Sequence, residues 1–323
     1  MTSSSRPDEP PTSGPGSSSD SGPGSGPREV LVVAHPRRPF VRDSAQRVLD
    51  LLTADGIRPR VLGDEAGELD LSCADLVDET DPAAAAGVEM VLVLGGDGSL
   101  LRGAALAREA DIPLLGVNLG HIGFLAEAES EALDSTVEAV VARAYTVEER
   151  MTLDVTVRNR REVIGTNWAL NEMALEKASP GRLLEVVVEI EGRPLSRWAC
   201  DGAVCATPTG STAYAFSAGG PVVWPSVEAL LVVPLSAHAL FARPLVVGPD
   251  VMVAFEVLGK ERGVLSCDGR RPIQVPSGHR VEITRGSRPV RLARVHPQPF
   301  TDRLVAKFDL PVEGWRGRSR STR

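Results

Sequence analysis

One apolar run constrains the fold more than any other part of this 323-residue chain. Residues 91–94, Val-Leu-Val-Leu, are followed directly by Gly95, Gly96, Asp97, Gly98 and Ser99. An unbroken β-branched and leucine run is typical of a parallel strand covered on both faces, and ligands collect beyond the carboxyl ends of such strands. Glycines there allow a sharp turn and let backbone amides approach phosphate oxygens. The run therefore predicts a ligand site around Asp97, although a tight turn that caps a following helix explains the same residues.

The segments around this turn predict a Rossmann-like α/β domain, because strands and helices alternate along the chain and such alternation produces a parallel sheet. A second glycine-bearing loop over 118–125, Asn-Leu-Gly-His-Ile-Gly-Phe-Leu, would lie beside the first loop at the same edge of the sheet. The expected strands are 28–34, 60–62, 91–94 and 112–117, and the expected helices are 42–54, 100–108 and 131–144.

From Thr152 onward the pattern changes to short alternating segments separated by turn signals such as Glu191-Gly192, Asp201-Gly202 and Asp268-Gly269. This pattern predicts an all-β domain built as an antiparallel sandwich or stacked sheets. The expected strands are 153–157, 163–175, 184–190, 203–206, 230–233, 251–257 and 281–284.

These segments divide the chain into two domains. We expect an α/β domain over 28–125, with 296–312 packing back onto it, and a mainly antiparallel β domain over 126–295. Residues 1–27 are rich in Ser, Gly and Pro, a composition that buries too little apolar surface to offset its ordering entropy, so this tail is expected to be disordered. The basic end over 313–323 is expected to fray.

Charge and cysteine content exclude several classes of protein. The net charge of -8 argues against a nucleic-acid partner, because a phosphate backbone recruits clustered Lys and Arg. The four cysteines have no paired spacing, which argues against a structural zinc site and predicts reduced thiols. No apolar run reaches the roughly eighteen residues of a membrane span, and the amino terminus lacks the pattern of a secretion signal. We therefore expect a cytoplasmic protein with no membrane partner.

The segment 201–221 has the most specific composition in the chain. It begins with Asp201-Gly202 and a short strand, and then reads Thr-Pro-Thr-Gly-Ser-Thr-Ala-Tyr over 207–214. Small hydroxyl residues at the end of a strand offer amides, hydroxyls and close approach together, and the ring of Tyr214 could pack against a base. These are groups that read a nucleotide. The alternative is a Ser/Thr-rich turn that caps a helix starting near Ala213, with Asp201-Gly202 as a plain hairpin turn.

Four segments together resemble the ATP-NAD kinase family: GGDGS over 95–99, NLGHIGFL over 118–125, the pair Asn171-Glu172, and TPTGSTAYAFSAGGP over 207–221. The resemblance covers residues 28–310. It implies an enzyme that transfers the γ-phosphoryl group of ATP to the 2′-hydroxyl of the adenosine ribose of NAD, giving NADP. Lipid kinases and phosphofructokinases share the GGDG element, whereas they lack the second, hydroxyl-rich segment.

The resemblance also implies residue roles. Asp97 would be catalytic and would orient the proton of the attacking ribose hydroxyl, while Gly95, Gly96, Gly98 and Ser99 would form the phosphate loop. The NAD-binding residues would be Asp97, Gly98, Arg102, Asn171, Glu172, Arg182, Asp201, Thr212, Ala213, Tyr214 and Ser217.

Several of these residues have simpler interpretations. Arg102 and Arg182 could be solvated surface arginines, and the pair Asn171-Glu172 could be a polar pair at a strand edge. His121 and His238 lack an identifiable catalytic partner, so we expect them to pack in loops or in the core. The turn Asp268-Gly269 resembles a family turn near the active cleft, but a hairpin explains it equally well, and it stays outside the predicted site.

The family implies Mg²⁺ that arrives with ATP and no dedicated protein metal ligand, because Mg²⁺ binds mainly through waters and substrate phosphates. Polyphosphate is an alternative donor, and the expected assembly is a homodimer or homotetramer. The sequence leaves two other functions open. One is a lipid or sugar kinase that shares GGDG, and the other is a non-catalytic NAD(P) sensor that keeps the cleft without transfer.

Overall fold

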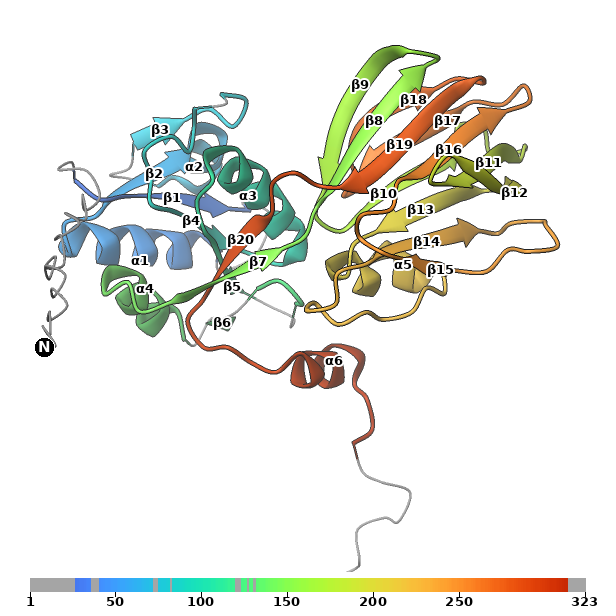
Figure 1. The fold of residues 1–323 in the computed structure, drawn as a ribbon. Coiled ribbons are helices and arrows are strands. Elements are labelled where there is room, and N and C mark those ends of the chain that lie inside the picture. Colours follow the sequence, from blue (N-terminus) through green and yellow to red (C-terminus); the bar gives the residue numbers. More distant parts are fainter. Residues whose placement is uncertain are drawn as a thin grey trace, which may run out of the picture.

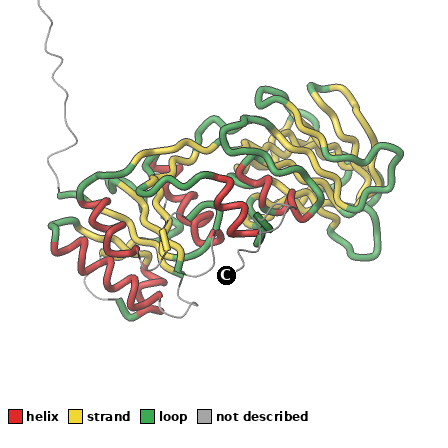
Figure 2. Tube along the Cα trace, turned by 90° about the horizontal axis from the view of Figure 1, so that it is seen from below, coloured by secondary structure: helices red, strands yellow, loops and turns green. Residues whose placement is uncertain are grey.

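The computed structural model describes residues 27–35, 41–71, 75–81, 83–119, 123–126, 128–129 and 132–312. The expectations for residues 1–26, for Cys73, for the middle of the second loop (120–122, including His121) and for 313–323 lie outside these residues. An α/β layer forms one part of the molecule and two antiparallel sheets form the other (Figure 1). Figure 2 shows that the molecule is elongated, with most of its helices gathered in one half.

The first sheet has the strand order β3-β2-β1-β4-β5-β20-β7, and β6 pairs with β5. Neighbours from β3 to β20 run parallel, and β7 is antiparallel to β20. The predicted Rossmann-like sheet is therefore confirmed. Its strands are β1 (Glu29–Ala34), β2 (Arg58–Leu62), β3 (Asp75–Val77), β4 (Met90–Leu94), β5 (Leu114–Asn118), β6 (Ala128–Glu129), β7 (Thr146–Arg150) and β20 (Val290–Arg294).

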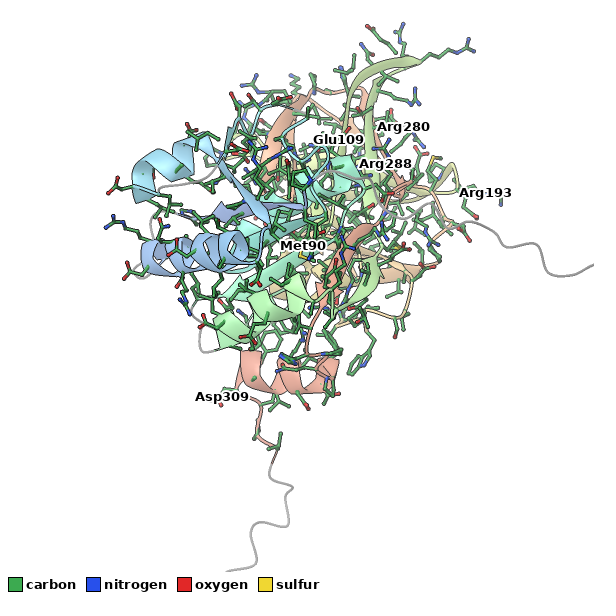
Figure 3. All side chains as sticks on the ribbon, turned by 90° about the vertical axis from the view of Figure 1, so that its left-hand side faces the viewer. Met90, Glu109, Arg193, Arg280, Arg288 and Asp309 are labelled. Carbon is green, nitrogen blue, oxygen red and sulfur yellow. The ribbon has the colours of Figure 1, made fainter. Side chains whose placement is uncertain are left out.

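Helices cover both faces of this sheet because its central strands are apolar on both sides. Leu49 and Leu52 of one helix pack into the same core cluster as Val137 of another, whereas Leu100 packs on the opposite face. Met90 lies inside this domain, and Glu109 points outward (Figure 3). The helices are α1 (Val41–Ala54), α2 (Gly63–Leu69), α3 (Asp97–Ala110), α4 (Leu133–Val141) and α6 (Phe300–Phe308).

The other part is a sandwich of two antiparallel sheets, ordered β15-β14-β13-β10-β17-β18 and β12-β11-β16-β19-β8-β9. The expected β-sandwich is confirmed. Its strands are β8 (Leu153–Asn159), β9 (Glu162–Ala169), β10 (Glu172–Lys177), β11 (Leu184–Ile190), β12 (Arg193–Cys200), β13 (Gly202–Ala206), β14 (Leu230–Leu235), β15 (Leu245–Val247), β16 (Val253–Leu258), β17 (Gly263–Cys267), β18 (Arg270–Val275) and β19 (His279–Arg285). A 3₁₀ turn, η2 (Thr209–Thr212), and a short helix, α5 (Tyr214–Ser217), follow β13.

The sequence pattern did not reveal two of the points at which the chain crosses from one sandwich sheet to the other. The single strand expected over 163–175 is wrong, because β9 ends at Ala169 in one sheet and β10 begins at Glu172 in the other. The expected turn at Asp201-Gly202 is likewise a crossing from β12 to β13. A Cβ on Gly202 would lie 2.4 Å from the Leu175 carbonyl oxygen, so this position requires glycine for packing.

Side chains from both sheets fill the sandwich core. Trp198 and Phe255 are fully buried there, and the Trp198 indole N–H donates to the Phe241 carbonyl at 3.0 Å. Cys200, Cys205 and Cys267 are free thiols in the same core, and burial raises the pKa of each to about 12. These thiols act as small apolar groups.

The two parts do not separate at one point in the chain. β7 and β20, which flank the sandwich strands in sequence, both belong to the first sheet. Aromatic contacts join the last helix to both parts, since Phe308 lies 4.6 Å from Phe216 and 5.7 Å from Phe124 between ring centroids. The division at residue 125 stays a prediction.

Replacing a core aromatic tests the sandwich. Phe255→Ala is expected to lower the free energy of unfolding by about 3–5 kcal/mol, because it removes a buried ring and leaves a cavity. Val163→Ala, on a side chain that is 48% exposed, should change it by less than about 0.5 kcal/mol. Denaturant titration measures both values, and equal effects of the two changes would contradict the core assignment.

Candidate functional site

The turn after β4 requires glycine at position 95, because the Ser99 side chain packs closely against it. Gly95 has φ +155°, and a Cβ there would lie 2.5 Å from the Ser99 Oγ. The Gly95 N–H donates to the Val117 carbonyl at 2.9 Å, which ties the turn to the end of β5. Gly96 is the N-cap of α3, so Asp97 is the first helical residue. The positive end of the helix and its free N–H groups therefore lie at the carboxyl edge of the sheet.

The Asp97 carboxylate is held by the second loop. It accepts hydrogen bonds from the N–H groups of Phe124, at 3.3 Å, and Leu125, at 3.2 Å. A Cβ on Gly123 would lie 2.4 Å from Asp97 Oδ1, so only glycine allows this approach. The two glycine-bearing loops thus meet at one carboxylate, which is fixed in orientation.

A cavity of about 750 Å³ lies beside the start of α3. Arg102 reaches into it and pairs with Glu65 and Glu79, each at 2.5 Å. Burial raises the pKa of Glu65 to about 7, against the opposing effect of the Ala34 N–H and Arg102. The lining residues are Val33, His35, Glu65, Glu79, Gly98, Ser99, Arg102 and Arg270.

Arg270 brings the β-sandwich to this cavity. Its guanidinium lies 3.5 Å from Glu79, the carboxylate that also pairs with Arg102 of α3. Next to this link, Trp168 of β9 contacts two guanidinium groups, those of Arg108 at 4.5 Å and Arg271 at 4.9 Å from the ring centroid. The first helix after the glycine turn is therefore joined to the sandwich by ion pairs and cation–π contacts.

Asp268 organises the sandwich side of the site. Its buried carboxylate accepts hydrogen bonds from the N–H groups of Leu170, at 2.9 Å, Asn171, at 2.8 Å, and Glu172, at 3.3 Å. These three hydrogen bonds hold the backbone at the point where β9 ends in one sheet and β10 begins in the other. Asp268 was not predicted as part of the site, because a hairpin turn explains an Asp-Gly pair and the sequence does not reveal what the carboxylate binds.

Glu172 is buried beside Asp268. Burial raises its pKa to about 8, the Asp268 charge adds to this effect, and the Tyr214 N–H opposes it. Its Oε2 atom is buried and has no hydrogen-bond partner within the described residues. A buried polar atom without a partner is costly, so this oxygen is suited to bind a ligand group.

The hydroxyl-rich segment after β13 packs directly on Asn171. A Cβ on Gly210 would lie 2.0 Å from the Asn171 carbonyl oxygen, so this position requires glycine. The Thr207 N–H donates to the same oxygen at 2.8 Å, and the Thr207 hydroxyl donates to the Leu170 carbonyl at 2.6 Å. The two predicted segments, 171–172 and 207–214, are thus one structural unit.

A groove of about 750 Å³ borders this unit at Tyr214 and also contains Asp201 and Ser217. Lys177 pairs with Asp201 at 2.5 Å and lowers the pKa of that carboxyl. The Tyr214 hydroxyl donates to Glu176 at 2.8 Å. Burial, supported by this bond, raises the pKa of Tyr214 to about 12. The groove therefore combines a flat ring with charged groups of both signs.

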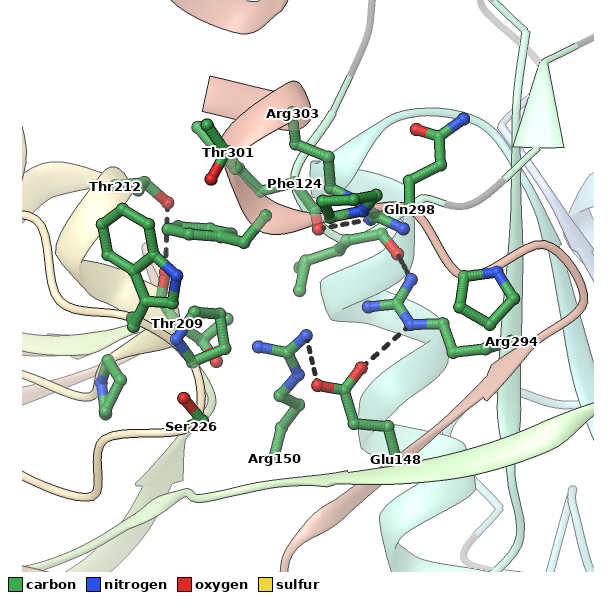
Figure 4. A pocket seen from close by; sticks show the side chains of 17 residues that line it. Phe124, Glu148, Arg150, Thr209, Thr212, Ser226, Arg294, Gln298, Thr301 and Arg303 are labelled. Atoms are coloured by element: carbon green, nitrogen blue, oxygen red, sulfur yellow. Dashed lines mark hydrogen bonds and ion pairs between the residues drawn. The ribbon is translucent and has the colours of Figure 1, made fainter. Parts of the chain in front are cut away.

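Three other residues of the predicted NAD-binding set, Thr212, Ala213 and Arg182, do not line the cavity beside α3 or the groove. Thr212 lines a third cavity, between the two parts of the molecule (Figure 4). Ala213 connects η2 to α5 beside it. Arg182 is exposed in the turn after β10, two residues from Pro180, which lines the groove. His238 is exposed after β14, and its N–H donates to the Ala199 carbonyl at 2.8 Å.

The structure thus brings Gly98, Ser99 and Arg102 into one cavity and Asp201, Tyr214 and Ser217 into a groove. Four residues were not predicted as part of the site. Glu65 and Glu79 pair with Arg102, Arg270 reaches Glu79 from the sandwich, and Asp268 holds the backbone of 170–172. No spacing or composition signal marks Glu65 or Glu79, since both act only through contacts with distant residues.

Within the described ranges, no group of three or more His, Cys, Asp or Glu side chains could hold a metal ion. No helix in that part of the chain is long and apolar enough to cross a membrane.

Two solved structures have a fold similar to that of this chain. The chain superimposes on a yeast NADH kinase complexed with NADH with a TM-score of 0.77 and 23% identity, covering 93% of this chain and 90% of that chain. An NAD kinase from Archaeoglobus fulgidus in complex with ATP gives a TM-score of 0.67 and 22% identity, covering 87% and 98%. At this identity the likeness concerns the fold.

Sequence comparisons identify the family. Residues 30–145 match the ATP-NAD kinase N-terminal domain, and residues 170–295 match the ATP-NAD kinase C-terminal domain. An NAD kinase from Thermobifida fusca is 60% identical over 301 residues, covering 90% of this chain and 92% of the relative. An NAD kinase from Rhodococcus opacus is 54% identical over 306 residues, covering 90% and 96%. This chain therefore belongs to the ATP-NAD kinase family.

Proposed function

We propose that this protein transfers the γ-phosphoryl group of ATP to the 2′-hydroxyl of the adenosine ribose of NAD, giving NADP. Family membership and high identity to NAD kinases support this activity. The observation that carries the site assignment is the ion-pair link from Arg102 through Glu79 to Arg270. It joins the helix that begins with Asp97 to the turn whose Asp268 holds Asn171 and Glu172.

Asp97 is the catalytic residue in this proposal. Its carboxylate stands at the start of α3, where free helical N–H groups favour a phosphate. Phosphoryl transfer depends mainly on positioning and charge neutralisation, so a weakly basic carboxylate that orients the ribose hydroxyl is sufficient. The hydrogen bonds from Phe124 and Leu125 fix the orientation that this role requires.

Glu172 and Asn171 bind the adenosine end in this proposal. At neutral pH Glu172 is protonated, because burial raises its pKa to about 8, and its unpartnered Oε2 is available to exchange a hydrogen bond with the ligand. Asp201, Tyr214 and Ser217 bind the dinucleotide from the groove, with Thr212, Ala213 and Arg182 next to this set. Gly95, Gly96, Gly98 and Ser99 form the phosphate loop.

Mg²⁺ binds with ATP in this proposal. Glu65 and Glu79, which line the cavity beside the phosphate loop, are already paired with Arg102, so this donor set suits an ion held mainly through nucleotide phosphates and waters. The ion would neutralise phosphate charge during transfer. We further propose a cytoplasmic homodimer or homotetramer, with polyphosphate as an alternative donor.

The activity is tested with a panel of acceptors and one substitution. Purified protein with ATP and Mg²⁺ is expected to form NADP from NAD and to leave diacylglycerol and fructose 6-phosphate unphosphorylated. Asp97→Asn keeps the side-chain shape but loses the charge, so turnover should fall by about 10²–10⁴-fold while NAD binding changes little. Asp111→Asn, at the other end of α3, is the matched control.

Unchanged turnover in Asp97→Asn would remove Asp97 from the chemistry. Phosphorylation of the lipid or the sugar, with none of NAD, would support the GGDG-sharing kinases instead. NAD binding without NADP formation would support a sensor.

The groove assignment predicts a ligand-specific effect at Tyr214. Tyr214→Ala should weaken NAD binding by about tenfold and ATP binding less, because an aromatic contact contributes about 0.5–1.5 kcal/mol beyond its buried area. Tyr214→Phe keeps the ring and loses only the bond to Glu176, so its effect should be small. Calorimetric titration measures both ligands, and a larger loss for ATP would mean that the groove binds the other nucleotide.

The raised pKa of Glu172 makes stability depend on pH. Between the unfolded pKa near 4.5 and the folded pKa of about 8, the folded carboxyl keeps a proton that the unfolded one has lost. The stabilisation that Glu172 contributes to the folded state is therefore fully present below pH 4.5 and is lost as the pH rises through about 8. Glu172→Gln removes the titration, so it should gain about 1–3 kcal/mol relative to the native protein between pH 5 and pH 9. Denaturant titrations across this range measure the gain.

Glu162→Gln, on an exposed side chain of β9, is the control for this change and should follow the native protein at every pH. If Glu172→Gln also had the same free energy of unfolding as the native protein at every pH, Glu172 would be ionised in the folded state.

A further inference from the structure

Two buried arginines from the far end of the chain hold the backbone of the second glycine-bearing loop. Arg303 of α6 donates to the carbonyl oxygens of Phe124, at 3.0 Å, and Ala126, at 3.2 Å (Figure 4). Arg294 of β20 donates to the carbonyl between them, that of Leu125, at 3.2 Å. Both arginines are at most 6% exposed. Three consecutive carbonyl groups of this loop are therefore bound by side chains about 170 to 180 positions away in the sequence.

One peptide group connects Arg303 to Asp97. The carbonyl of Phe124 and the N–H of Leu125 belong to the same planar trans unit, in which the two bonds point in opposite directions. Arg303 binds the oxygen of this unit, and its N–H donates to the Asp97 carboxylate at 3.2 Å. Fixing the oxygen therefore fixes the direction of the N–H. A cationic donor on the carbonyl also polarises the unit, which strengthens its hydrogen bond to the carboxylate.

The side chain of Phe124 is held by the same helix. Its ring centroid lies 5.9 Å from that of Phe300 and 5.7 Å from that of Phe308, and these two residues stand at the two ends of α6 with Arg303 between them. Residues 124 and 125 belong to no helix or strand, so contacts of this kind determine how their peptide groups are oriented. The last helix of the chain thus fixes both the ring and the carbonyl of Phe124.

We propose that Arg303 is a positioning residue for phosphoryl transfer, and that it acts on the Asp97 carboxylate through the peptide group between residues 124 and 125. This inference rests on the proposed function. Arginine suits the role because its planar guanidinium presents several donors in a fixed geometry, whereas the lysine ammonium is a point charge on a flexible stem. A small displacement of a catalytic group costs much of the rate, so the effect of Arg303 falls on turnover and leaves substrate binding in place.

Steady-state kinetics of full-length variants test the proposal. Arg303→Met removes the donors and keeps an apolar stem, so kcat for NADP formation should fall by about 10–100-fold, while KM for NAD and for ATP changes by less than about twofold. Arg303→Lys keeps the charge and can hold one carbonyl, so its kcat should lie between those of Arg303→Met and the native protein. In the Asp97→Asn background, Arg303→Met should lower turnover by less than about a further twofold, because it acts through the lost carboxylate.

Hydrogen exchange at the amides of Phe124 and Leu125 gives a readout that does not depend on activity. Arg303→Met should speed exchange at both amides by about tenfold, because their hydrogen bonds to Asp97 open more often. Arg28→Met is the matched control. Arg28 also donates to two backbone carbonyls, those of residues 140 and 141, but it lies at the opposite edge of the sheet, before β1. This change should leave kcat and the exchange of both amides as in the native protein.

Four results would overturn the proposal: native kcat in Arg303→Met, a loss confined to KM, an equal loss of kcat in Arg28→Met, or unchanged exchange at the two amides. A full further loss of turnover in the Asp97→Asn background would also contradict it. If Arg303→Met fails to fold, Arg303→Lys decides by the same measurements. If the native protein forms no NADP from NAD, the proposed function fails, while the exchange comparison still decides whether Arg303 orients the segment that holds Asp97.

Discussion

The candidate site depends on one buried carboxylate, that of Asp268. By accepting three backbone N–H groups from residues 170–172, it shapes the break between β9 and β10. The hydroxyl-rich segment then packs on this break, where only Gly210 fits against the Asn171 carbonyl. Loss of the carboxylate would leave three buried donors without partners, and each such donor costs roughly 1–3 kcal/mol.

Ion pairs and cation–π contacts join the two parts of the molecule. Arg102 and Arg270, from different parts, share Glu79, and Arg108 and Arg271 share the ring of Trp168. Partly buried pairs of this kind contribute geometry more than net stability, because desolvation offsets much of the attraction. They hold the start of α3 against the turn that contains Asp268. This arrangement supports the proposal that Asp97 acts on a nucleotide bound by the sandwich.

Local patterns predicted the architecture well and the connections poorly. Apolar runs such as 91–94 predicted buried parallel strands, because a strand that is buried on both faces consists almost entirely of apolar residues. The strand expected over 163–175 was wrong, because the apolar pattern continues through the point where the chain changes sheets. Glu65 and Glu79 could not be predicted as part of the site, since their roles come only from contact with Arg102.

The sequence by itself determined the family, the two kinds of sheet and the segments that carry Asp97, Asn171 and Tyr214, because short motifs and apolar periodicity are local properties. Only the tertiary structure decided which segments meet, because contacts between distant residues leave no local trace. Folding assigned Asp268 to the backbone of 170–172 and Glu148 to two arginines. It also raised the pKa of Glu172 to about 8, since burial depends on what the rest of the chain covers.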